Sequence, residues 1–155
     1  QELALGHPDR VGRLVLACTS PGGTKAFPTP KATIELMQAR ATLRQFTEHA
    51  LQPDPRPEIV DRILVHRERT AQPFEHWAAQ AAASATFDAH SRLGSLTMPT
   101  LVQTGDGDLV VDARNSELLA NAIPNARLSV FPGAGHIFMW QEPQRFVAEL
   151  EEFLC

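Results

Sequence analysis

Three short apolar runs, each closed by glycine or by polar turn residues, most constrain the fold of this chain. They lie near residues 14–18, 100–105 and 127–131. Helix-like patterns of apolar residues follow the second and third runs, over about residues 112–122 and 142–154. This alternation is typical of right-handed βαβ units, and it predicts an α/β fold around a parallel sheet of three strands with flanking helices.

Residues 24–90, between the first and second runs, show a different pattern. Apolar residues recur there at helical spacing, and prolines separate the segments. The pattern predicts about four short helices and gives no sign of a strand. We therefore predict a helical insertion over residues 24–90, carried by a core of residues 1–23 and 91–155.

The overall composition excludes several classes of function. A net charge of −4 provides no basic surface for a phosphate backbone, so no nucleic-acid partner is expected. No apolar run approaches the roughly 20 residues that cross a bilayer, so no membrane partner is expected either. The two cysteines, Cys18 and Cys155, cannot form a disulfide framework, which indicates a cytoplasmic location.

Polar side chains follow two of the apolar runs, where the ligands of an open parallel sheet collect. Asp106 and Asp108 follow the second run, and His136 follows the third after a turn of proline and glycines. A carboxylate that accepts the Nδ1 proton of a histidine fixes the tautomer and leaves Nε2 free as a base. The sequence thus predicts that His136 pairs with one of the two aspartates.

The order of these motifs resembles the C-terminal half of the α/β-hydrolase family. The matching stretch is Gly105-x-x-Asp108-x-Val110-Val111, a helix, a strand, and Gly133-Ala134-Gly135-His136. Residues 1–16 resemble the helix after the family's nucleophile elbow and the next strand, so the resemblance covers the whole chain. It is closest to enol-lactone hydrolases and cofactor-free haloperoxidase-like esterases. It implies a partial α/β-hydrolase fold in which residues 24–90 form a helical cap.

The resemblance also implies roles for single residues. Asp108 matches the triad acid, because it lies three residues after a glycine and before an apolar pair, and His136 matches the base. Asp106 is a rival acid on the same turn. The implied activity is hydrolysis of a carboxylic ester or lactone, with a small-molecule substrate and without a cofactor. The expected substrate-binding residues are Trp77, Phe138, Met139 and Trp140.

The family's nucleophile elbow, G-x-S-x-G, does not occur in this sequence. By the resemblance, the serine would lie upstream of Gln1, so the chain is expected to be part of a longer protein and inactive alone. Two alternatives stay open. One is a dehalogenase or epoxide hydrolase with an upstream aspartate as nucleophile, and the other is a non-catalytic ligand-binding or interaction module on the same scaffold. An open strand edge at residues 14–18 would favour self-association.

Other motifs give weaker signals. The remaining histidines lack the spacing of a metal site, and Asp106-x-Asp108 lacks the further ligands of a calcium loop, so no metal is expected. Gly105-x-Gly107 lacks the third glycine of a dinucleotide-binding turn. Cys18 has no glycine elbow around it, and we expect it to be a buried residue at a strand end rather than a nucleophile.

Overall fold

The computed structural model describes the backbone of residues 1–155 and every side chain except those of Phe74 and Trp77. The elements follow one another as α1 (Glu2–Gly6), the 3-10 helix η1 (Pro8–Arg10), β1 (Leu14–Ala17), α2 (Lys31–Gln38), α3 (Leu43–Ala50), α4 (Pro57–Arg69), α5 (Phe74–Thr86), the 3-10 helix η2 (His90–Ser95), β2 (Thr100–Gly105), α6 (Arg114–Ala122), β3 (Ala126–Phe131), α7 (Phe138–Gln141) and α8 (Pro143–Leu154).

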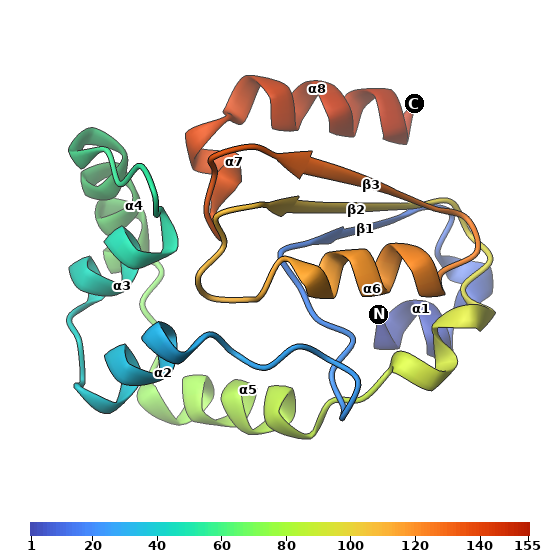
Figure 1. Ribbon diagram of the computed structural model, residues 1–155, viewed down its shortest axis with the longest axis horizontal. Helices are drawn as coiled ribbons and strands as arrows, with labels where there is room; N and C mark the ends of the chain where they lie inside the picture. The colour runs from blue at the N-terminus through green and yellow to red at the C-terminus, as the bar shows by residue number, and fades with distance from the viewer.

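The three strands form one parallel sheet in the order β1-β2-β3. Leu14 of β1 lies opposite Thr100, and Thr100 of β2 lies opposite Ala126. Helix α8 covers one face of the sheet, and α6 and α1 lie on the other (Figure 1). The predicted α/β class and the parallel sheet of three strands are confirmed.

The central strand is the most buried of the three. All six residues of β2 are buried, because β2 has a strand on either side and helices on both faces. In β1 only Leu16 is buried, and its neighbours in the strand are partly exposed although the run is almost entirely apolar. The reason is position, since β1 pairs with a single strand in the described chain and β3 likewise forms an edge.

Two apolar clusters hold the helices on the sheet. The cluster on the α6 side contains Leu16, Val102, Leu119 and Ile123 with residues of η2. The cluster on the α8 side contains Cys18, Phe131, Ala134 and Phe138, with Phe146 of α8 packed against them. Burial of such side chains contributes about 1.5–3 kcal/mol each, which makes these two clusters the main source of stability for the sheet layers.

The four helices expected in residues 24–90 are present as α2, α3, α4 and α5. Helices α3 and α4 lie beyond the carboxyl ends of the strands, at the left of Figure 1. A short antiparallel contact joins the two ends of this helical insertion. The backbone N–H of Gly23 donates to Phe87 O at 3.0 Å, and that of Ala89 donates to Pro21 O at 2.9 Å. The insertion therefore leaves and re-enters the sheet at one place.

Several predicted boundaries shift by a few residues. The helix predicted from Asp112 begins at Arg114. The Asp112 carboxylate accepts the Arg114 backbone N–H at 3.0 Å in the turn that precedes the helix. The short helix α7 was not predicted, and it directly follows the loop that carries His136. No helix among the residues described is long and apolar enough to cross a membrane.

Candidate active site

Asp108 and His136 meet at the carboxyl edge of the sheet. Asp108 lies on the turn after β2 and His136 on the turn after β3, and the parallel register of these strands brings the turns together. His136 Nδ1 lies 2.9 Å from Asp108 Oδ2. The Asp108 side chain is fully buried, whereas 26% of the His136 side chain is exposed. The imidazole therefore connects a buried carboxylate to the surface of the site.

The Asp108 carboxylate is held on its other oxygen as well. Oδ1 accepts the backbone N–H of Val110 at 2.8 Å and that of Val111 at 2.9 Å. Partners on both oxygens satisfy the buried carboxylate and fix its plane. The two residues that follow Leu109 thus supply the donors to Oδ1 from their backbone.

Asp106, the rival acid, has a different partner. Its Oδ1 accepts the backbone N–H of Gly133 at 2.7 Å, and the residue is exposed. Asp106 thereby ties the turn after β2 to the turn after β3, without contacting the His136 ring in any hydrogen bond of the structure. The geometry pairs His136 with Asp108, and it gives Asp106 the position of a turn-bracing carboxylate.

The structure describes three of the four expected substrate-binding side chains, and they differ in their surroundings. Phe138 is fully buried between Phe131 and Phe146, with ring centroids at 4.3 and 5.6 Å, so it packs in the core. Met139 is partly buried against the same cluster. The fourth expected residue, Trp77, has a side chain outside the described part of the structure.

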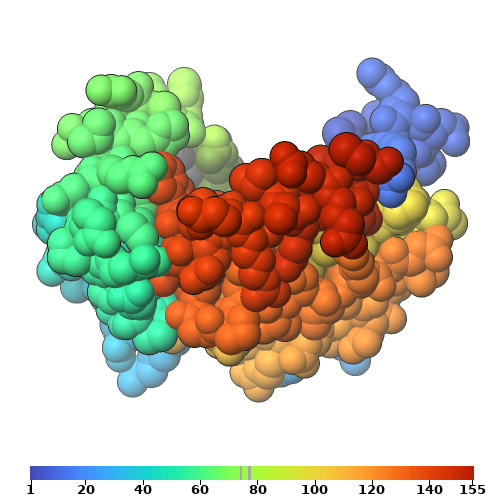
Figure 2. All heavy atoms as spheres, turned by 90° about the horizontal axis from the view of Figure 1, so that it is seen from above, coloured from blue at the N-terminus to red at the C-terminus, as the bar shows by residue number. Residues whose placement is uncertain are grey.

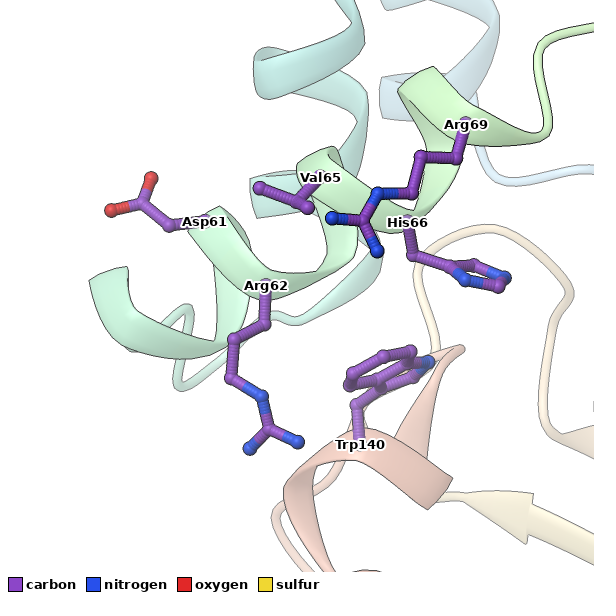
Figure 3. A pocket seen from close by; sticks show the side chains of 6 residues that line it. All are labelled: Asp61, Arg62, Val65, His66, Arg69 and Trp140. Carbon is purple, nitrogen blue, oxygen red and sulfur yellow. The ribbon is translucent and has the colours of Figure 1, made fainter.

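Trp140 lies against α4 rather than in the core. It borders a surface hollow of about 360 Å³ that is also lined by Asp61, Arg62, Val65, His66 and Arg69. Figure 3 shows Arg62 and His66 extending from α4 toward the Trp140 ring. The Arg62 guanidinium lies 5.6 Å from the ring centroid, within cation–π range. Neither Asp108 nor His136 lines this hollow. Trp140 also packs against the apolar cluster of α4, and so connects α7 to the helical insertion.

Gln141 connects the site to the insertion, and the sequence pattern did not single it out. Its Oε1 accepts the backbone N–H of Gly135 at 2.8 Å, and its Nε2 donates to Leu51 O at 2.8 Å. The side chain is buried. Nε2 also donates to Asp54 O at 3.3 Å, so one amide bonds to a backbone group beside His136 and to two just after α3.

Replacing Gln141 by leucine is expected to lower the free energy of unfolding by about 2 kcal/mol, because the buried Gly135 N–H loses its partner and Leu51 O keeps only the Asp54 N–H. Urea denaturation followed by circular dichroism measures this change. Gln144→Leu, on the exposed face of α8, is the matched control and should stay within about 0.5 kcal/mol of the unmodified protein. Equal stability of the two variants would contradict the bridging role of Gln141.

Cys18 lies beside the Asp108–His136 pair and completes the only such group of possible metal ligands among the described side chains. Sγ of Cys18, a carboxylate oxygen of Asp108 and a ring nitrogen of His136 all lie within 4.8 Å of one another. Burial, followed by the nearby Asp108 carboxylate, raises the pKa of the Cys18 thiol to about 12. A metal would have to displace that proton and the His136–Asp108 contact, which disfavours metal binding here.

No serine of the chain is placed as a nucleophile for His136. The structure describes all six serine side chains, and none of their hydrogen bonds involves the His136 ring. Among the hydrogen bonds of the described side chains, the His136 ring therefore pairs with Asp108 and with no serine.

Comparison with known proteins agrees with the fold and with the order of the motifs. A family model described as the alpha/beta hydrolase fold matches residues 31–143. A 2-hydroxy-6-oxononadienedioate/2-hydroxy-6-oxononatrienedioate hydrolase of Cupriavidus pinatubonensis is 29% identical over 166 residues, covering 97% of this chain and 56% of the relative. The chain thus spans little more than half the length of such curated relatives.

Two solved structures resemble nearly the whole of this chain and likewise extend beyond it. Est816, described as an N-acyl homoserine lactone degrading enzyme, is 29% identical with a TM-score of 0.75, over 98% of this chain and 61% of that one. A thermophilic esterase from Thermogutta terrifontis is 26% identical with a TM-score of 0.73, over 97% and 58% of the two chains. By fold, motif order and family match, this chain belongs to the alpha/beta hydrolase fold family.

Proposed function

We propose that this chain supplies the acid and the base of a hydrolase that cleaves a carboxylic ester or lactone. The observation that carries the proposal is the 2.9 Å contact between His136 Nδ1 and the buried, doubly anchored Asp108. Buried carboxylates are costly unless they are well paired, so this arrangement favours a functional role over chance packing. The names of the relatives, an esterase and a lactone-degrading enzyme, support the substrate class.

In the proposed mechanism, a serine upstream of Gln1 attacks the carbonyl carbon of the substrate. His136 Nε2 takes the serine proton during the attack and returns it to the leaving alkoxide, and water then repeats the cycle on the acyl-enzyme. The Asp108 carboxylate accepts a hydrogen bond from Nδ1–H, which keeps Nε2 free as the base and stabilises the imidazolium that forms. The oxyanion donors would come from the residue after the serine and from an earlier loop.

We further propose that the helical insertion, residues 24–90, acts as a cap over the substrate. Helices α3 and α4 lie beyond the carboxyl ends of the strands, where substrates of such sheets bind. The contacts of Gln141 and Trp140 attach the insertion to the loop of His136. We still propose Met139 and Trp77 as substrate-binding residues. The complete burial of Phe138 instead favours a role in the core.

The test is turnover of p-nitrophenyl acetate by the longest natural polypeptide that contains this chain. A G-x-S-x-G motif in that polypeptide, together with turnover, would support ester hydrolysis. An aspartate at the elbow would instead favour a dehalogenase or epoxide hydrolase. Lack of the elbow and of turnover would favour a binding or interaction module.

The open edge of β1 supports a separate proposal for residues 1–155 when they are produced alone. Within the described chain β1 pairs only with β2, so its outer backbone groups lack a neighbouring strand. Figure 2 shows the helical insertion and the N-terminal segment rising at opposite ends, with a lower surface between them. Such an edge recruits other strands, so size-exclusion chromatography should show association that increases with concentration. A monomer at all concentrations would contradict this.

A further inference from the structure

Cys18 occupies an unusual position at the end of β1. Its backbone has a φ of 46°, in the left-handed region that non-glycine residues rarely adopt. Its N–H donates to Gln103 O at 2.9 Å, which extends the β1–β2 ladder by one residue. The side chain is buried in the cluster of Phe131, Ala134 and Phe138. Such backbone strain persists only where the surroundings over-determine the conformation.

The left-handed turn directs the Cys18 side chain to the Asp108–His136 pair. Its Sγ lies within 4.8 Å of both a carboxylate oxygen of Asp108 and a ring nitrogen of His136. An ideal β-strand continuation would place the next side chain above or below the sheet instead. The polarisable sulfur therefore lies beside the carboxylate, at the border of the buried cluster to which Cys18 belongs.

The remaining acceptor capacity of Asp108 fits a thiol donor. Oδ1 accepts two backbone N–H groups, whereas Oδ2 faces only the His136 ring among the hydrogen bonds of the structure. A carboxylate oxygen has two lone-pair directions, so Oδ2 has room for one more weak donor. The Cys18 thiol stays protonated, because burial and the carboxylate raise its pKa to about 12. It can therefore donate and cannot act as a thiolate nucleophile.

We propose that Cys18 is a positioning residue for the Asp108–His136 pair, with its S–H directed at the Asp108 carboxylate. The proposal rests on the proposed function in assuming that the pair does chemistry. The thiol shares the carboxylate charge with the imidazole, fills the space beside the ring and excludes water from it. Without the thiol, the Nδ1 proton of His136 is the sole donor to Oδ2, so the bond between them becomes shorter. The ring also loses the side chain packed beside it, and its Nε2 is less well placed.

The first test is the proton NMR signal of His136 Nδ1–H in the longest natural polypeptide that contains this chain. Its loss in His136→Ala identifies the signal, which lies far downfield of the backbone amides. We expect Cys18→Ala to move the signal further downfield. Cys18→Ser, which keeps a donor, should leave it near its original position. Cys18→Gly is a second variant without a thiol, and glycine adopts a φ of 46° without strain, so it folds even where alanine does not.

The second test is kinetic and uses p-nitrophenyl acetate. Cys18→Ala should lower kcat about fivefold, as expected for one weak hydrogen bond, and leave KM within about twofold. Cys18→Ser should recover most of the loss, and Cys155→Ala, at the exposed C-terminus, should have no effect. An unchanged Nδ1–H signal in both variants without a thiol would overturn the positioning role, as would a serine variant that behaves like alanine.

The two proposals fail in different ways. If the signal moves as expected and the protein turns over no ester, the proposed function is wrong and the positioning of Asp108 by Cys18 stands. If turnover depends on His136 and the Nδ1–H signal stays at the same position in the Cys18 variants, the proposed function stands and Cys18 only fills space. Absence of any downfield signal from the unmodified protein would overturn the contact on which both proposals depend.

Discussion

Replacing His136 by alanine is expected to reduce ester turnover by the intact polypeptide at least about 1,000-fold. Nε2 is the only described base held at the carboxyl edge of the sheet by a buried carboxylate, and without it a serine hydroxyl stays protonated. Initial rates with p-nitrophenyl acetate measure the effect. His76→Ala, on the exposed surface of α5, is the control and should retain full activity.

The two aspartates of the turn sharpen this prediction. Asp108→Asn should lower kcat to a similar extent, because an amide facing Nδ1 favours the wrong tautomer. Asp106→Asn should change kcat less than about threefold, since the amide oxygen can still accept the Gly133 N–H. Activity within tenfold of the unmodified enzyme in His136→Ala, or a larger loss from Asp106→Asn than from Asp108→Asn, would contradict the assignment.

Replacing Gly105 by alanine is expected to lower the free energy of unfolding by about 3 kcal/mol or more. Gly105 ends β2, directly under the loop that carries His136. A Cβ there would lie 2.1 Å from Ala134 O and 2.5 Å from Gly135 O. Both are backbone atoms, so relief of the clash requires the loop to move, and the Asp108–His136 contact should be lost with it. Urea denaturation gives the stability change.

Gly94→Ala is the matched control for this substitution. Gly94 lies in η2, and a Cβ there meets nothing within 4 Å, so the change should stay within about 1 kcal/mol. If Gly105→Ala were as stable as Gly94→Ala, the close packing of the two turns would be wrong. If it were unstable and fully active, the packing would not be what aligns His136.

The layout of the chain could be predicted from the sequence because its signals are local. The apolar run in β2 and the glycines after it mark a buried strand and its end, and the helical spacing in residues 24–90 marks the insertion. The pairing of His136 with an aspartate followed from the parallel sheet alone, since the carboxyl ends of its strands meet at one edge. The choice of Asp108 over Asp106 needed the family resemblance.

What the sequence did not reveal depends on contacts between distant residues. Gln141 binds Gly135 and Leu51, and the latter lies 90 residues away, so no spacing rule points to this glutamine. The weak burial of β1 reflects its position at the edge of the described sheet, which no local sequence pattern reveals. Cys18 seemed an ordinary buried residue because the φ of 46° that turns it toward Asp108 leaves no trace in composition.

The central claim is that this chain carries the acid and base for a nucleophile upstream of Gln1. Labelling of the longest natural polypeptide with a fluorophosphonate, followed by mass spectrometry of its peptides, tests that claim most directly. We predict one adduct, on a serine of a G-x-S-x-G elbow before Gln1, which disappears in His136→Ala although the protein stays folded. An adduct on any of the six serines of residues 1–155, or labelling that persists without His136, would contradict the account.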